Sequence, residues 1–164
     1  MPTEEGVYIG ALTRKEQLTV LEDQVQDALS KGATLLYGGK RSAGKGYYFE
    51  PTVLVNVTNE MKVMREESFG PIIGIMKVKD DEEALIFMKD TAYGLTAAVY
   101  SQDVDRAQRI LSDIDAGSGY WNCCDRVSAG LPWSGRKHSG FGATLSHQGF
   151  RAFVKPKAWH LRKS

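Results

Sequence analysis

Apolar runs alternate with helical segments between residues 72 and 122, and no other feature of the sequence constrains the fold as strongly. The apolar runs are Ile72–Lys79, Leu95–Ser101 and Ser118–Asn122. Residues 80–89 and the segment after Asp103 repeat apolar side chains at helical spacing. This order is typical of parallel strands that are buried on both faces and joined by helices. The sequence therefore predicts an α/β fold with an open, mainly parallel sheet and flanking helices.

The region before residue 72 is predicted to hold a helix and three short strands. The helix is expected over Arg14–Lys31, because apolar residues recur there at helical spacing. These residues are Leu18, Leu21, Val25, Ala28 and Leu29. Thr13 and Glu16 have the spacing of a capping box, and Gly32 suits the end of the helix. The strands are expected at residues 34–37, 47–50 and 52–57.

Residues 123–149 are predicted to form a glycine-rich loop with one helical turn near Ser146, because five glycines interrupt any periodicity. Irregular segments of this length usually carry function. Phe153–Arg162 is a partly alternating stretch that predicts an extended C-terminal arm with an edge strand. We therefore expect a main domain over residues 1–152 and an arm over residues 153–164.

Charge is unevenly distributed along the chain. Residues 126–164 hold eight Lys and Arg, three His and no Asp or Glu, so their formal net charge is +8. Because the whole chain carries +1, residues 1–125 carry −7. The basic segment lacks the pattern of a known nucleic-acid-binding motif, and we do not expect nucleic acid as a partner. We expect it to lie against acidic surface of its own body or of another subunit.

Length and composition favour a single soluble domain with a cytoplasmic location. A chain of 164 residues can bury a sizeable core, and no apolar run is long enough to span a bilayer. Met1–Gly10 lacks the order of charges and apolar residues that defines a signal peptide. Cys123 and Cys124 are adjacent, which disfavours a disulfide between them and gives no metal-ligand spacing, so no metal site is expected.

Three local patterns suggest chemistry and are better explained structurally. Gly39, Gly44 and Lys45 match part of a phosphate-binding loop, but a strand pattern follows them in place of a helix, which favours a flexible basic turn. His138–Ser139 lacks the spacing of a nucleophile motif and is interpreted as surface polar residues. Cys123 and Cys124 follow a strand, where catalytic thiols occur, but buried structural thiols are the favoured interpretation.

The segment Arg65–Pro71 is more informative. Its carboxylates, its aromatic ring and its Gly-Pro bend could offer an acceptor for ribose hydroxyls and a flat ring beside a planar ligand. The alternative is an exposed acidic turn that packs Phe69 into the core, and the local pattern favours that alternative.

The order of motifs along the chain, however, resembles the aldehyde dehydrogenase superfamily from about residue 10 to the end. Residues 66–71 (EESFGP) resemble its E-E-x-F-G-P signature, and residues 131–142 resemble P-x-G-G-x-K-x-S-G-x-G. Three further segments resemble family motifs in the same order, at residues 47–53, 93–99 and 115–122. The resemblance covers only the closing third of such an enzyme, so the chain looks like the C-terminal part of the catalytic domain plus the oligomerisation arm.

This resemblance implies NAD(P)-dependent oxidation of an aldehyde to a carboxylic acid. In the family, a cysteine forms a thiohemiacetal with the aldehyde, a hydride passes to the nicotinamide, and a glutamate activates water. The nucleophile, the base and the cofactor domain would lie upstream of this chain, and Cys123 and Cys124 do not fall on the nucleophile position. The isolated chain is therefore expected to be inactive and to bind NAD or NADP at most weakly.

The resemblance also assigns roles to individual residues. Glu67 falls on the glutamate that binds the nicotinamide ribose, and Phe69 on the aromatic residue near the nicotinamide. Val127 and Trp133 fall on positions that line the tunnel for the aldehyde substrate. The arm implies a homo-oligomer, with Phe153, Trp159 and Leu161 at the contact.

Two departures from the family pattern leave the substrate subgroup open. Trp133–Ser134 replaces the common Phe-Gly, and Ala143–Thr144 replaces the usual Arg-Glu. The alternative function is a non-catalytic interaction module that uses its basic tail to bind protein or nucleic acid.

Overall fold

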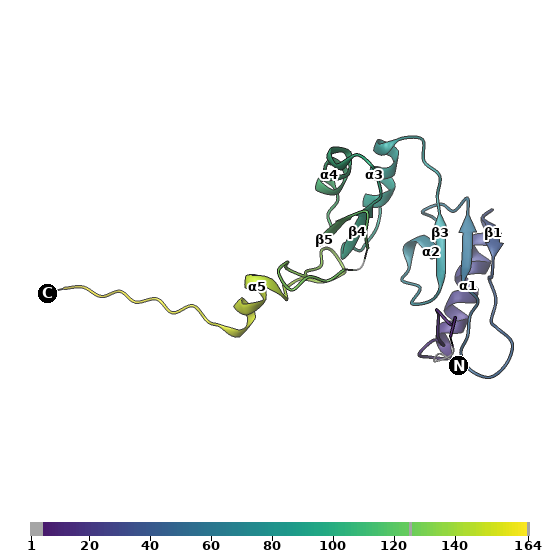
Figure 1. Ribbon diagram of the computed structural model, residues 1–164, viewed down its shortest axis with the longest axis horizontal. Coiled ribbons are helices and arrows are strands. Elements are labelled where there is room, and N and C mark those ends of the chain that lie inside the picture. The colour runs from purple at the N-terminus through teal and green to yellow at the C-terminus, as the bar shows by residue number, and fades with distance from the viewer. Residues whose placement is uncertain (1–4, 125, 164) are drawn as a thin grey trace. The chain divides into compact units, whose positions relative to one another are not determined.

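The computed structural model describes residues 5–124 and 126–163, and the chain divides into two compact units, Met1–Lys79 and Asp80–Ser164 (Figure 1). The sequence predicts no signal peptide at Met1–Gly10, and residues 1–4 of that segment lie outside the described residues. Each unit has its own small sheet. No helix in the described part of the chain is long and apolar enough to cross a membrane.

The first unit is a three-stranded sheet packed against one long helix. The strands β1 (Thr34–Tyr37), β2 (Thr52–Val55) and β3 (Ile72–Ile75) lie in the order β1-β2-β3. β1 is antiparallel to β2, and β3 is parallel to β2. The helix α1 (Glu16–Ser30) packs its buried side chains against Leu54 of β2 and Ile72 of β3. This contact forms the core of the unit.

The apolar stripe of α1 is largely as the sequence predicts. Leu18, Leu21, Val25 and Ala28 are buried, whereas Leu29 is 37% exposed and does not belong to the stripe. The predicted capping box is wrong, because the N-cap residue is Lys15 and no side chain caps the helix. Gly32 ends the helix with φ +95°, where the amides of Gly32 and Ala33 bond to carbonyls of the last turn.

A short helix, α2 (Lys62–Arg65), was not expected from periodicity. Its first amide, from Lys62, donates to the Asp27 carboxylate of α1 at 2.8 Å. The helix start is therefore capped from a distant part of the chain, which local patterns do not reveal. The strand expected at residues 47–50 is also absent from the described structure, where Phe49 forms an isolated bridge to Arg41.

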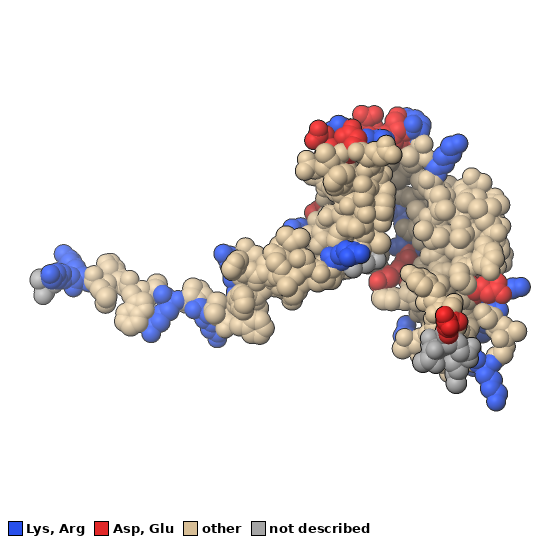
Figure 2. Space-filling view, viewed as in Figure 1, with Lys and Arg blue, Asp and Glu red and all other residues tan. Residues whose placement is uncertain are grey.

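The second unit contains a parallel pair of strands, β4 (Thr96–Val99) and β5 (Ser118–Trp121). They are joined by α4 (Val104–Asp113), which follows α3 (Asp81–Lys89). Asp103 caps α4 by accepting the Arg106 amide at 3.0 Å, as its position in the sequence predicts. Helix α4 buries Ala107 and Ile110. Acidic and basic side chains mix over the end of the unit formed by α3 and α4 (Figure 2).

The α/β class is confirmed, and two of the three strand pairings among residues 5–124 and 126–163 are parallel. The strands at residues 72–79, 95–101 and 118–122 do not share one sheet, however. β3 pairs with β2, and β4 pairs with β5. Hydrophobic periodicity identifies a strand but does not identify the partner of that strand, which explains the difference.

The chain ends with a helical turn and an extended segment. The helix α5 (Ser146–Phe150) confirms the turn expected near Ser146, and the 3₁₀ helix η1 (Arg151–Phe153) continues it. Residues 154–163 are exposed and lie outside any helix or strand, so the edge strand expected within Phe153–Arg162 is absent from the described residues. The domain boundary expected between residues 152 and 153 stays a prediction.

Candidate functional site

A strained loop after α2 carries Glu67 and Phe69. Both side chains are exposed, Phe69 by 71%. Phe69 has φ +42°, in the left-handed region that bulky residues rarely adopt. Such strain persists only where surrounding contacts enforce it, and it is often found at functional sites. Packing of Phe69 into the core, the alternative favoured by the local pattern, is therefore wrong.

Residues of helix α1 and strand β2 contact the backbone of this loop. The buried Gln17 donates its side-chain amide to the carbonyl of Ser68. Gly70 lies so close to Leu21 that a Cβ atom on Gly70 would stand 2.4 Å from Leu21 Cδ1. The carbonyl of Pro71 accepts the Thr52 amide at 2.8 Å. The backbone of the loop is thus fixed while the side chains of Glu67 and Phe69 remain exposed.

Glu67 and Phe69 have the chemistry that one end of a dinucleotide requires. An exposed carboxylate can accept hydrogen bonds from the two hydroxyls of a ribose. An exposed aromatic ring two residues later offers a flat apolar surface to a planar heterocycle. The residues present therefore fit the nicotinamide riboside part of NAD or NADP.

In the second unit, Val127 and Trp133 line one pocket of about 240 Å³. The first residues of β5 and Leu145 line the same pocket. Trp133 is half-buried, and its backbone exchanges two hydrogen bonds with Thr144, at 2.8 and 2.9 Å. The two residues that the sequence assigns to a substrate tunnel are thus brought together by the fold.

The glycine-rich segment after Trp133 packs closely on the start of β5. A Cβ atom on Gly117 would stand 1.6 Å from the carbonyl oxygen of Ser134, so only glycine fits at this position. The pair His138–Ser139 has a structural role here. The backbone amide of His138 donates to the carbonyl of Ala92 at 2.9 Å, and Ser139 Oγ accepts a hydrogen bond from the backbone amide of Gly94 at 3.1 Å. Sequence reasoning did not identify these contacts.

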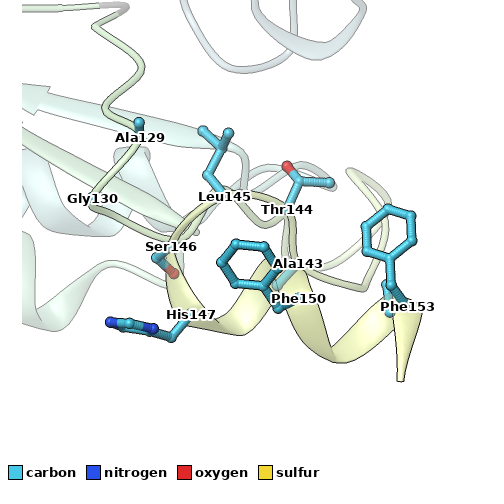
Figure 3. A pocket seen from close by; sticks show the side chains of 11 residues that line it. Ala129, Gly130, Ala143, Thr144, Leu145, Ser146, His147, Phe150 and Phe153 are labelled. Atoms are coloured by element: carbon cyan, nitrogen blue, oxygen red, sulfur yellow. The ribbon is translucent and has the colours of Figure 1, made fainter. Parts of the chain in front are cut away.

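A second, apolar pocket of about 590 Å³ lies beside α5 and η1 (Figure 3). Leu145, Phe150 and Phe153 contribute its large apolar side chains, and His147 also lines it. Leu145 belongs to this pocket and to the one that contains Trp133. This pocket was not predicted from the sequence, and Phe153 was assigned from the sequence to the oligomerisation arm alone.

The remaining candidates lie outside these pockets. Cys123 is half-buried and Cys124 is exposed, so the expectation of buried thiols is wrong for Cys124. Lys45 lies in an exposed bend, and no helix follows it before Tyr48. This geometry agrees with a basic turn rather than a phosphate-binding loop.

The residues assigned to the arm are strongly exposed. The exposed fractions are 87% for Phe153, 70% for Trp159 and 83% for Leu161. Lys157 Nζ lies 4.4 Å from the centre of the Trp159 ring, which is a cation–π distance. In Figure 2 the charged side chains visible along this segment are Lys and Arg.

The site residues therefore fall into separate groups. Glu67 and Phe69 share one loop of the first unit, and Val127 and Trp133 share one pocket of the second. Gln17, Leu21 and Gly117 support these groups through contacts that were not predicted from the sequence. Among the described residues, no group of three His, Cys, Asp or Glu side chains could hold a metal ion.

Comparison with known proteins identifies the family of the chain. Residues 1–159 match the model of the aldehyde dehydrogenase family, and the chain belongs to this family. The succinate-semialdehyde dehydrogenase [NADP(+)] of Deinococcus radiodurans is 40% identical over 156 residues, which are 95% of this chain and 33% of that protein. The chloroplastic betaine aldehyde dehydrogenase of Atriplex hortensis is 37% identical over 158 residues, which cover 95% of this chain and 32% of that protein.

Solved structures of relatives share the fold. Betaine aldehyde dehydrogenase from Staphylococcus aureus, in complex with NAD+, has a TM-score of 0.85 and 32% identity over 92% of this chain and 31% of that chain. Lactaldehyde dehydrogenase from Escherichia coli has a TM-score of 0.88 and 31% identity over 93% of this chain and 32% of that chain. The chain thus spans about a third of the length of the curated relatives it matches.

Proposed function

We propose that this chain is the C-terminal part of an NAD(P)-dependent aldehyde dehydrogenase that oxidises an aldehyde to a carboxylic acid. The family match over residues 1–159 carries the proposal. The order of the motifs, from the E-E-x-F-G-P signature to the glycine-rich loop, favours the C-terminal third. The relatives act on different aldehydes, as their names state.

In this proposal Glu67 and Phe69 hold the cofactor. NAD(P)+ supplies the hydride acceptor when it is bound. The Glu67 carboxylate accepts hydrogen bonds from the ribose hydroxyls and orients the ring that the ribose carries. Phe69 packs beside that ring and limits its movement. The contacts of Gln17 and Leu21 support these roles, because they fix the loop before any ligand binds.

Val127 and Trp133 line the path of the aldehyde in this proposal. Their shared pocket has a volume of about 240 Å³, and its walls include aromatic and aliphatic side chains. Apolar walls of this kind favour the transfer of the carbon chain of an aldehyde from water into the pocket.

The purified chain is expected to show no aldehyde-dependent formation of NADH or NADPH, because the nucleophile and the base would be supplied by other parts of the enzyme. Turnover by the chain alone that disappears in Cys123→Ser or Cys124→Ser would contradict this assignment. The same assay with the serine variants serves as the control for chemistry by these two thiols.

A chimera tests the role of Glu67. This chain would replace the matching third of the Deinococcus radiodurans relative, and hydride transfer would be followed in a single turnover. Hydrogen bonds to a charged group contribute about 1.5–3 kcal/mol, so Glu67→Gln should slow hydride transfer by roughly tenfold or more while the aldehyde KM changes less. The exposed neighbour offers the matched control, Glu66→Gln. An unchanged hydride-transfer rate in Glu67→Gln would exclude the ribose contact.

We also propose that the arm forms a homo-oligomer contact through Phe153, Trp159 and Leu161. The exposure of these apolar residues and the extended backbone of residues 154–163 support this assignment.

A further inference from the structure

The side chain of Lys137 closes the end of a helix that is distant in sequence. Its Nζ donates to the carbonyl oxygens of Lys89 and Thr91 at 3.1 and 3.0 Å. Lys89 is the last residue of α3. Carbonyl groups at a helix C-terminus lack intrahelical partners and carry partial negative charge. An ammonium group is well suited to both properties.

Backbone contacts continue from this point along the same segment. The amides of Arg136 and His138 donate to Gly94 O and Ala92 O, both at 2.9 Å. Tyr93 and Lys137 form an antiparallel bridge. Lys137 itself has φ +53°, a strained value for a residue with a side chain. Residues 136–139 therefore lie along residues 89–94, and the Lys137 ammonium holds the end of that contact nearest to α3.

Trp133 lies only four residues before Lys137 and has its own anchor. Its backbone pairs with Thr144, and the carbonyl of Ser134 touches Gly117. The short connection between Trp133 and Lys137 is thus held at both ends. A change at the Lys137 end must be accommodated within these few residues, next to the indole that lines the pocket.

We propose that Lys137 is a positioning residue for Trp133. By capping α3, it fixes the glycine-rich loop in the conformation that sets the indole in the wall of the pocket. The importance of this position for an aldehyde rests on the proposed function. The positioning itself is a property of this chain and can be measured without substrate.

Nuclear magnetic resonance of the ¹⁵N-labelled chain tests the proposal. The chain has three Trp residues, so three indole N–H signals are expected, and Trp133→Phe assigns the relevant one. Lys137→Met should shift the Trp133 signal and speed amide exchange at Arg136 and His138 by about three- to tenfold, as expected for the loss of a charged donor. The signal of Trp121, whose Nε1 donates to Ser101 O at 2.9 Å, should stay in place.

Two variants complete the design. Lys137→Arg keeps the charge and the donors and should restore the Trp133 signal, whereas Lys155→Met in the exposed arm should change neither readout. If Lys137→Met does not fold, Lys137→Gln is compared in the same way and should give a smaller shift of the same kind. An unmoved Trp133 signal in a folded Lys137 variant, or no rescue by Lys137→Arg, would overturn the proposal.

The chimera separates this proposal from the assignment of the tunnel. In the chimera, Lys137→Met should raise the KM for the aldehyde more than it lowers kcat. If the Trp133 signal moves and the KM does not, the positioning role stands and Trp133 is not a tunnel residue.

Discussion

The side chain of Leu21 occupies the space that a Cβ atom on Gly70 would need, with only 2.4 Å between that Cβ position and Leu21 Cδ1. Leu21 is fully buried in α1, whereas Gly70 follows the exposed Phe69 in the loop proposed to hold the cofactor. The core of the first unit and the candidate site are therefore in direct contact. A substitution in the core is therefore expected to alter the conformation of the loop, and a substitution in the loop to alter the stability of the core.

A double-mutant cycle at Leu21 and Gly70 measures this contact. Gly70→Ala should lower the free energy of unfolding by about 1–3 kcal/mol through overpacking, and Leu21→Ala by about 2–5 kcal/mol through the cavity it leaves. Gly70→Ala should cost less in the Leu21→Ala background, because the clash is then relieved. Urea unfolding followed by circular dichroism gives these values. Gly130→Ala is the matched control, since its Cβ would meet only Ser128 Oγ, at 3.9 Å. Strict additivity of the two variants would contradict the contact.

The side-chain amide of Gln24 is fully buried in α1 and finds no hydrogen-bond partner among the described residues. A buried polar group left unsatisfied costs about 1–3 kcal/mol. Gln24→Met, which keeps the length of the side chain, should therefore raise the free energy of unfolding by an amount of this order. Thermal unfolding of this variant and of the exposed control Gln26→Met distinguishes burial from helix propensity. A destabilised Gln24→Met chain would show that the amide has a partner, such as an internal water.

The pKa of the Asp81 carboxyl lies below its usual value of 3.8, first because Arg106 donates hydrogen bonds to it and then because Arg106 and Arg109 are positively charged. A lowered pKa in the folded state means that the interaction stabilises the chain above the unfolded-state pKa. The stabilisation is lost as the pH falls through the lowered value. An NMR titration should show that Arg106→Gln raises the pKa of Asp81, whereas Lys45→Gln in the other unit leaves it unchanged. An identical titration in Arg106→Gln would exclude the pairing.

The arm should control association of the chain. We expect light scattering of the intact chain to show a dimer or a larger assembly, because exposed apolar side chains and unpaired backbone recruit other chains. A chain that ends at Gly149 should become monomeric or aggregate. Trp159→Ser should weaken association, and Lys163→Ser at the end of the arm provides the control. A monomeric intact chain at micromolar concentration, with Trp159 freely quenched by solvent, would disprove the contact.

Local sequence patterns were sufficient for the elements whose cause is local. The stripe from Leu18 to Ala28 marks the buried face of α1, Asp103 caps α4, and Gly32 ends α1. The resemblance of residues 66–71 to a family signature also pointed to Glu67 and Phe69. These features depend on neighbours within about one helical turn or on a contiguous motif, so the sequence carries them directly.

Tertiary structure decided which elements meet. β3 pairs with β2, and β4 pairs with β5. The local sequence does not predict these pairings, because the hydrophobic pattern of a strand is the same whichever strand lies beside it. Helix α2 depends on the Asp27 carboxylate of α1, and the exposure of Phe69 depends on a loop held by Gln17 and Leu21. The pocket of Trp133 likewise needs Thr144 and Leu145 beside it. The sequence by itself determined the faces and ends of the helices and the family motifs. Contacts between residues far apart in the chain, which close only in the folded state, determined the strand partners and the shape of the site.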